Sequence, residues 1–168
     1  RVSQFWTFKA SAGNLATFPA TLFQAWMLHQ PGEWFADLRG VCPELEESLP
    51  ATKLEVLAGR QIGSLLQQAR RCLTVDKAAR ATLDAKWRQS LQPAVLRSLL
   101  ELYAGPDTRY LNYYGSPRTV TTVPYVQALR GEGPGLVGKI VLVGASDKFQ
   151  PEQKDGFYSV YSDHTGLD

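Results

Sequence analysis

The spacing of hydrophobic residues changes several times along the chain, and each change predicts an element. Apolar and polar residues alternate in RVSQFWTFKASAG, which predicts a strand that ends at the turn Gly13-Asn14. In TFPATLFQAWMLHQ the apolar residues recur on one helical stripe, with Thr17 as the candidate N-cap and Pro19 in the first turn. The Pro-Gly pair at 31–32 ends this helix, and a short helical segment follows at 34–38.

Three further helices are predicted in the middle of the chain. Apolar residues at three- and four-residue spacing over 50–73 predict one amphipathic helix. Thr74 is the candidate N-cap of the next helix, where Asp76 is favourably placed for the positive end of the helix dipole, and this helix runs to about residue 89. The third helix covers about 93–105, between a proline and a glycine.

After residue 105 the periodicity changes from helical to alternating. Tyr110–Tyr114 alternates between two faces and predicts a strand, PYVQAL predicts a short helix that stops at Gly131, and the apolar run in KIVLVGAS predicts a strand buried on both faces. Strand, helix and strand over about 109–145 form a βαβ unit. The predicted fold is therefore α/β, with a parallel or mixed sheet, flanking helices and a helical insertion at about 50–104.

Composition is consistent with one globular domain. The 168 residues are 44% hydrophobic, which is enough for a core, and we expect residues 1–168 to be a fragment of a larger protein because both ends lack a closing element. The 18 Lys and Arg against 16 Asp and Glu are scattered along the chain, which argues against a nucleic-acid groove. The longest apolar run, at 140–143, is too short to span a bilayer, and no signal peptide is evident.

The two cysteines, Cys42 and Cys72, allow two interpretations. They belong to no CxxC motif or Cys/His cluster that would hold zinc. In an oxidising compartment they would pair, and the closed loop would stabilise the fold by roughly 3 to 4 kcal/mol. Alternatively, they are two buried free thiols. Spacing alone does not decide between a disulfide and free thiols, because it does not report the distance between the two Cα atoms.

Catalytic and nucleotide-binding signatures are weak. The loop after VLVGAS lacks the glycine run and the Lys-Ser/Thr pair of a phosphate loop, and GxGxxG is missing from the sequence. His29 closes an apolar helix and His164 lies in a Gly/Ser/Asp turn, so we expect no enzyme; a small hydrolase is a minor alternative. Asp147, Asp155 and Asp163 lack the spacing of a calcium loop, so neither a metal nor another cofactor is expected.

The stretch after residue 109 has the highest concentration of polar and aromatic side chains, namely Tyr110, Asn112, Tyr113, Tyr114 and Arg118. Tyrosines on a half-buried strand usually fill a sheet surface and satisfy their hydroxyl groups locally. A contact to a small ligand or a partner is the other interpretation, and residue types alone leave both open.

Several motifs of the last third of the chain resemble the second type of CHASE domain, an extracellular sensor module of bacterial signalling receptors. They are the aromatic-Asn-Tyr-Tyr-Gly strand followed by Pro, a Thr-rich turn, a Pro-Tyr helix start, and the strand GKIVLVGAS. Asp155-Gly156-Phe157 fits the acidic-aromatic loop that tends to follow in this family, and FPATLFQAW weakly resembles an earlier helix. The resemblance covers the C-terminal portion of the family.

The resemblance implies a non-enzymatic sensory input domain on the periplasmic or extracellular side of the cytoplasmic membrane. In the full receptor it would be membrane-anchored and coupled to a cytoplasmic kinase or to an adenylate or diguanylate cyclase, in response to an unknown small ligand or periplasmic partner. Candidate ligand contacts lie at or beyond the predicted strand ends: Tyr113, Tyr114, Arg118, Ser146 and Asp147. The alternative is a protein-interaction module or homodimer built on the amphipathic helical block.

Overall fold

The computed structural model describes residues 4–110, 121–133, 135–136, 139 and 141–143. Contacts divide the chain into two units, one made of Trp6–Arg109 and the other of the remaining residues. Of the described residues, 60% are helical and 8% lie in strands.

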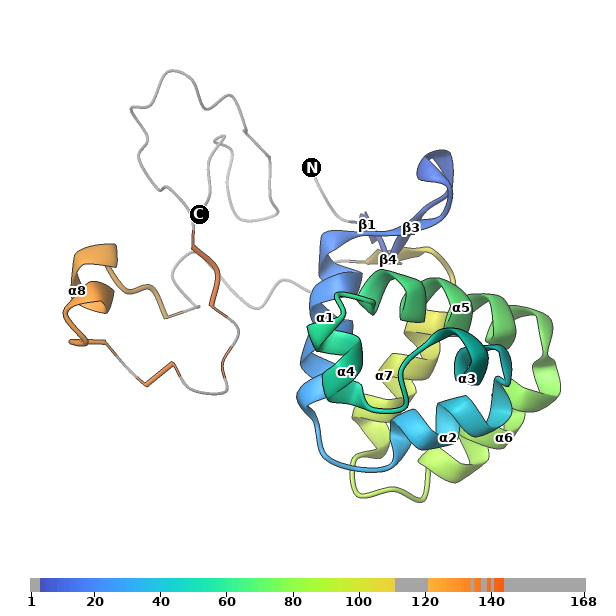
Figure 1. Ribbon diagram of the computed structural model, residues 1–168. Helices are drawn as coiled ribbons and strands as arrows, with labels where there is room; N and C mark the ends of the chain where they lie inside the picture. Colours follow the sequence, from blue (N-terminus) through green and yellow to red (C-terminus); the bar gives the residue numbers. More distant parts are fainter. Residues whose placement is uncertain (1–3, 111–120, 134, 137–138, 140, 144–168) are drawn as a thin grey trace. The chain divides into compact units, whose positions relative to one another are not determined.

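Seven α-helices make up most of the first unit (Figure 1). Their bounds are α1 (Phe18–His29), α2 (Trp34–Val41), α3 (Glu44–Ser48), α4 (Lys53–Ala58), α5 (Ile62–Val75), α6 (Lys77–Trp87) and α7 (Pro93–Ala104). Helix α5 is the centre of this arrangement, because it packs against α1, α3, α4, α6 and α7. The helices predicted at 17–29, 34–38 and 93–105 are confirmed in position.

The prediction of one helix over 50–73 is wrong. Helix α4 ends before Gly59, and α5 begins only at Ile62. Between them Arg60 takes a left-handed φ of 54°, which a continuous helix does not allow. A capping box of Thr52 and Glu55 opens α4.

The predicted start of the next helix at Thr74 is also wrong. Helix α5 continues through Thr74, whose hydroxyl donates a 2.6 Å hydrogen bond to the carbonyl of Arg70 one turn earlier. The N-cap is Asp76, whose Oδ1 accepts hydrogen bonds from the backbone N–H groups of Ala78 and Ala79 at 2.8 and 2.9 Å. An aspartate satisfies these free donors and also carries the charge that the helix dipole favours.

The core of the first unit is mainly aliphatic, with one buried polar pair. Leu38, Leu65 and Leu99 are fully buried. Between α1 and α7, the Tyr103 hydroxyl donates a 2.6 Å hydrogen bond to Gln24 Oε1. Burial raises the pKa of Tyr103 well above its ordinary value, and the hydrogen bond to Gln24 opposes this only in part.

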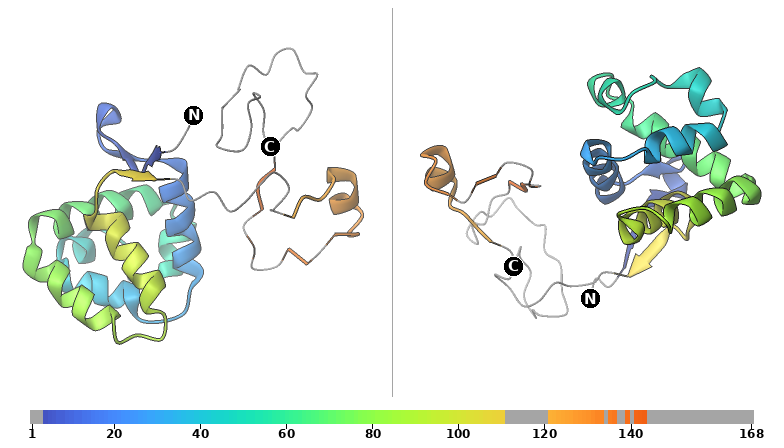
Figure 2. Two further views of the ribbon diagram at one scale, coloured as in Figure 1. Left: turned by 180° about the vertical axis from the view of Figure 1, so that it is seen from behind. Right: turned by 90° about the horizontal axis from the view of Figure 1, so that it is seen from below.

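The strands are short and lie at one end of the helical unit, beside the start of α1 (Figures 1 and 2). They are β1 (Gln4–Trp6), β2 (Phe8–Lys9), β3 (Leu15–Ala16) and β4 (Thr108–Tyr110). β2 pairs with β3 in antiparallel register, Phe8 opposite Ala16, and β1 pairs with β4. The strand predicted at the N-terminus is present as two pieces with a bend at Thr7 between them, and Gly13 and Asn14 both have positive φ at the predicted turn.

Arg70 ties this small β region to the central helix. Its guanidinium lies 4.4 Å from the ring centroid of Phe8 and pairs with the carboxylate of Asp107, just before β4. The Thr7 backbone N–H donates a 2.8 Å hydrogen bond to the Asp107 carbonyl. The strands are therefore anchored on α5, and Phe8 of β2 is itself part of the buried core.

The predicted α/β fold with a parallel or mixed sheet is wrong. The chain is mostly helical, with two small antiparallel two-stranded sheets, and the helices of 50–104 share one core with α1 and α2. Of the predicted βαβ unit, the short helix α8 (Tyr125–Leu129) is present, and Gly131 follows it with a φ of 71°. Of the first predicted strand only Tyr110 is described, at the end of β4, and residues 111–114 lie outside the described residues. Residues 141–143 of the KIVLVGAS run are not in a strand and are exposed. A short apolar run does not by itself specify a buried parallel strand, which is why the interpretation failed.

Candidate functional site

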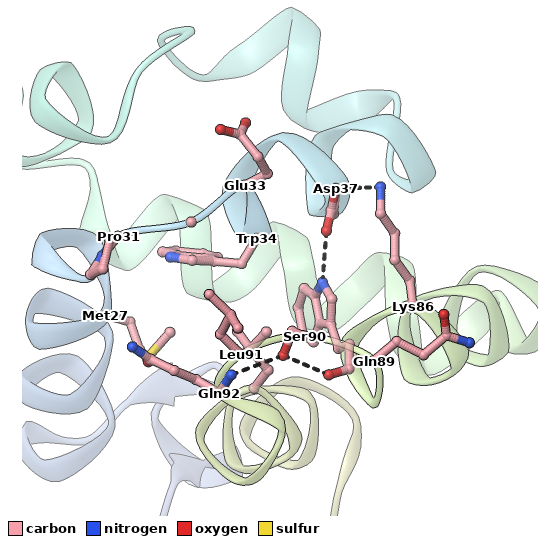
Figure 3. Close-up of a pocket in the computed structure, with 13 residues that line it drawn as sticks. Met27, Pro31, Glu33, Trp34, Asp37, Lys86, Gln89, Ser90, Leu91 and Gln92 are labelled. Atoms are coloured by element: carbon pink, nitrogen blue, oxygen red, sulfur yellow. Dashed lines mark hydrogen bonds and ion pairs between the residues drawn. The ribbon is translucent and has the colours of Figure 1, made fainter.

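A pocket of about 320 Å³ opens in the helical unit where α1 ends, α2 begins, and α6 passes into α7 (Figure 3). The four helices and the turns that join α1 to α2 and α6 to α7 supply its lining: Met27, Pro31, Gly32, Glu33, Trp34, Asp37, Lys86, Trp87, Gln89, Ser90, Leu91, Gln92 and Leu96. The volume is at the lower end of the range of small-molecule sites.

The walls of the pocket are mostly apolar, and their aromatic side chains are buried. Trp34 and Trp87 are each only 2% exposed, and Met27 and Leu96 are also buried. The Trp34 ring packs edge-on against Phe35, with 5.7 Å between the ring centroids. Large aromatic side chains held in the core provide a fixed, preformed surface for a ligand.

One polar group of the pocket, the carboxylate of Asp37, is fully engaged. Its Oδ1 lies 2.7 Å from Lys86 Nζ, and its Oδ2 accepts a 3.1 Å hydrogen bond from Trp87 Nε1 (Figure 3). The Asp37 side chain is 11% exposed and the Lys86 side chain 63% exposed, so the pair reaches from the wall to the solvent. These contacts hold α6 against α2 and set the position of the Trp87 ring.

The other tryptophan has an unpaired donor. Trp34 Nε1 is buried and has no hydrogen-bond partner in the described part of the chain. In Figure 3 the ring nitrogen lies on the side of Pro31. An unpaired N–H shielded from water costs roughly 1 to 3 kcal/mol relative to a satisfied one.

Lys53 holds the turn that covers this side of the pocket. Its Nζ donates hydrogen bonds to the carbonyls of Gln30 and Gly32, at 2.7 and 3.2 Å, on both sides of Pro31. The same ammonium lies 5.8 Å from the ring centroid of Trp34. Gly32 has a φ of 101°, a conformation that L side chains rarely adopt.

On the opposite side, the α6–α7 loop is fixed by a serine. Ser90 Oγ donates a 2.8 Å hydrogen bond to the Trp87 carbonyl and accepts one from the Gln92 backbone N–H at 3.3 Å. The Gln92 side chain extends toward Met27 (Figure 3). This loop therefore carries an amide side chain into the pocket on a defined backbone.

The far end of α2 is joined to α5 by a disulfide. Of the two interpretations of Cys42 and Cys72, the structure has the bonded pair, with 6.0 Å between the Cα atoms and 30 residues of sequence separation. In the chain-entropy description a loop of this length stabilises the fold by about 3.5 kcal/mol. Neither cysteine is a free thiol, so neither is available as a nucleophile.

The residues predicted as ligand contacts lie outside the described residues: Tyr113, Tyr114, Arg118, Ser146 and Asp147. The sequence interpretation missed the pocket residues Trp34, Asp37 and Trp87. Both tryptophans fall within segments that the sequence predicts as helices, at 34–38 and in the helix that ends at about residue 89. The hydrogen bond that joins Trp87 to Asp37 spans 50 residues, and no local pattern indicates such a pairing.

Neither a metal-binding cluster nor a membrane-spanning helix is present within the described ranges. No cluster of three or more His, Cys, Asp or Glu side chains there has the arrangement of a metal site. None of the helices described combines the length and the apolar character needed to cross a bilayer. His29, the last residue of α1, is exposed.

Comparisons with known proteins gave no match to a family model, to a curated protein or to a solved structure.

Proposed function

We propose that this chain is a non-enzymatic, extracytoplasmic sensory module of a membrane-anchored signalling receptor, and that it binds a small molecule in the pocket between α1, α2, α6 and α7. The observation that carries the proposal is the pocket itself, with its volume of about 320 Å³ and its two buried tryptophans. A preformed, largely apolar cavity with a few oriented polar groups is the usual form of a small-molecule site.

The disulfide supports the proposed location outside the cytoplasm. Bonds such as Cys42–Cys72 form and persist in secreted and periplasmic proteins and are rare in the cytosol of mesophiles. The resemblance of the last third of the chain to an extracellular sensor domain supports the same location and the coupling to a cytoplasmic kinase or nucleotide cyclase.

Signal transfer would follow from the position of the pocket between helices. A ligand that contacts both Trp34 on α2 and Leu96 on α7 favours one spacing of these two helices over others. Helix α7 leads directly into β4, and from there the chain continues to the residues that carry the resemblance. A change in the position of α7 is therefore passed along the chain in the direction of the proposed output domain.

The test is a ligand screen with a blocked pocket as reference. Gln92→Phe places a ring where the Gln92 side chain extends toward Met27, and Gln67→Phe is the matched control because Gln67 is exposed on α5 and does not line the pocket. We expect small periplasmic metabolites and apolar fragments to raise the melting temperature of the unmodified protein and of Gln67→Phe, but not of Gln92→Phe. Stabilisation that is equal in all three proteins, or no stabilisation by any compound, would contradict the proposal.

A second candidate function is a protein-interaction or dimerisation module, and one surface favours it. Trp6, Leu15 and Phe18 are 60%, 55% and 68% exposed. They lie close together, because the Thr17 hydroxyl donates a 2.6 Å hydrogen bond to the Trp6 carbonyl and Leu15 pairs with Lys9 across the β2–β3 hairpin. Sedimentation over a range of concentrations tests this: self-association that Phe18→Ser abolishes supports it, and a constant monomer mass argues against a homodimer.

A further inference from the structure

The packing of the pocket walls does not explain why the buried indole N–H of Trp34 has no hydrogen-bond partner in the described part of the chain. Three buried side-chain atoms lack a hydrogen-bond partner within the described residues: Gln24 Nε2, Trp34 Nε1 and Gln61 Oε1. Only Trp34 among these residues also lines the pocket. The Trp34 N–H is shielded, so a ligand in the pocket reaches it only when a neighbouring segment moves. An unpaired donor in the wall of a pocket is then a binding capacity, whereas the same donor in a filled core is only a cost.

The charges around the pocket restrict what this donor would accept. The ionisable residues of the lining are Glu33, Asp37 and Lys86, and the last two neutralise each other. Glu33 is exposed at the rim, and its charge is offset by the Lys53 ammonium, which lies 5.8 Å from the ring centroid of Trp34. These charges sum to zero, and because an unpaired ion is costly to bury against apolar walls, the oxygen that accepts from Trp34 belongs to an uncharged group.

We propose that the pocket takes a small, uncharged, mainly apolar molecule with a carbonyl oxygen, and that the indole N–H of Trp34 donates a hydrogen bond to that oxygen. This inference rests on the proposed function and specifies the ligand class for the same site. The Met27, Trp87 and Leu96 side chains contact the apolar part of the molecule. The hydrogen bond to Trp34 orients it.

The ligand reaches the N–H by displacing the turn at Pro31-Gly32. Both residues are exposed, and Pro31 lies on the side of the Trp34 ring nitrogen (Figure 3). Lys53 holds the turn only through its hydrogen bonds to the Gln30 and Gly32 carbonyls. Binding is therefore accompanied by a change in the environment of the Gly32 amide.

The experiment uses two probes of the same shape, acetophenone and α-methylstyrene, in which a carbonyl oxygen is replaced by a methylene group. Their binding is followed through the tryptophan indole N–H signals in nitrogen–proton correlation spectra of the disulfide-bonded chain. We expect acetophenone to bind about tenfold more tightly, the equivalent of one hydrogen bond, and to move the Trp34 indole proton downfield. α-Methylstyrene should perturb Trp34 and Trp87 without that downfield shift.

Trp34→Phe keeps an aromatic wall but removes the donor, and it should abolish the preference for acetophenone. Trp26→Phe is the matched control, because Trp26 is a half-buried tryptophan of α1 that does not line the pocket, and it should keep the preference. Equal affinities of the two probes in the unmodified protein would overturn this inference and leave pocket binding intact. If neither probe perturbs Trp34 or Trp87, the proposed function fails with it.

Discussion

The two tryptophan-bearing walls of the pocket contain the same side chain in different states. On α6, Trp87 is buried and its N–H is bonded to the carboxylate of Asp37. On α2, Trp34 is equally buried and its N–H has no partner in the part of the chain that the structure describes. Burial alone therefore does not distinguish these two tryptophans. An unpaired polar atom indicates a candidate ligand contact only where its residue also lines a pocket, as Trp34 does and Gln24 and Gln61 do not.

The largest expected effect tests what holds the α2 wall. Replacing both cysteines in the double variant C42A/C72A opens the link between the end of α2 and α5, and we expect the free energy of unfolding to fall by about 3.5 kcal/mol. Urea denaturation of the variant and the unmodified protein measures this. Hydrogen exchange of the α2 amides should accelerate more than that of the α6 amides, and equal acceleration would show that the disulfide does not serve the α2 wall in particular.

The next effect compares the two tryptophans directly. Trp87→Phe and Trp34→Phe remove the same ring volume, but only the first takes a hydrogen bond from the Asp37 carboxylate, whose Oδ2 loses its donor while Oδ1 keeps Lys86. We expect Trp87→Phe to destabilise the protein by about 2 kcal/mol more than Trp34→Phe, since hydrogen bonds to charged groups are worth more than neutral ones. Chemical denaturation of both variants gives the difference. Equal losses of stability would mean that the hydrogen bond from the Trp87 N–H does not stabilise the fold, and that the two tryptophans do not differ in this respect.

A third effect concerns Tyr103, whose buried hydroxyl is hydrogen-bonded to Gln24 just as the N–H of Trp87 is hydrogen-bonded to Asp37. Burial raises the folded-state pKa of Tyr103 above the unfolded value of 10.0, so its contribution to stability is present below pH 10 and is lost as the pH rises further. We expect the free energy of unfolding to fall by about 1 kcal/mol for each pH unit above 10 because of this group. Tyr103→Phe should remove that part of the slope in denaturation curves at pH 9, 10 and 11; an unchanged slope would exclude Tyr103 as its source.

The smallest effect tests the turn beside Trp34. Lys53→Met keeps most of the unbranched side chain but removes the donor to the Gln30 and Gly32 carbonyls. These bonds lie near the surface, so we expect a loss of about 1 kcal/mol or less. Exchange of the Gly32 amide should accelerate, with α6 unaffected. A variant that exchanges at the original rate would show that the turn does not depend on Lys53.

Local patterns predicted the helices well where cap, stripe and stop residues agree. The segment around Thr17 and Pro19 is an example, and so is the helix that begins at Pro93. They failed at the break between α4 and α5, where Gly59, the C-cap of α4, was included in one continuous helix, and where the left-handed conformation of Arg60 has no sequence signature in an arginine. Asp76 was identified for its charge, yet its role as the N-cap was given to Thr74.

The pocket could not be predicted from these patterns, because its parts come together only through tertiary packing. Asp37 and Trp87 are neighbours across two helices, and the sequence contains no indication that α2 packs against α6. The α/β interpretation failed for a related reason. It depended on the apolar run in KIVLVGAS, and the side chains of Val141, Leu142 and Val143 are 50%, 74% and 82% exposed.

The Cys42–Cys72 bond also decides how the chain responds to a single backbone cut. The covalent ring that it closes includes α3, α4 and most of α5, and the segment at Ala51 and Thr52 within this ring is exposed. A protease that cleaves there produces two polypeptides that stay attached, so α2 is not released from α5. In a compartment that contains secreted proteases, the helices that line the pocket would therefore stay together after the exposed segment between α3 and α4 has been cut.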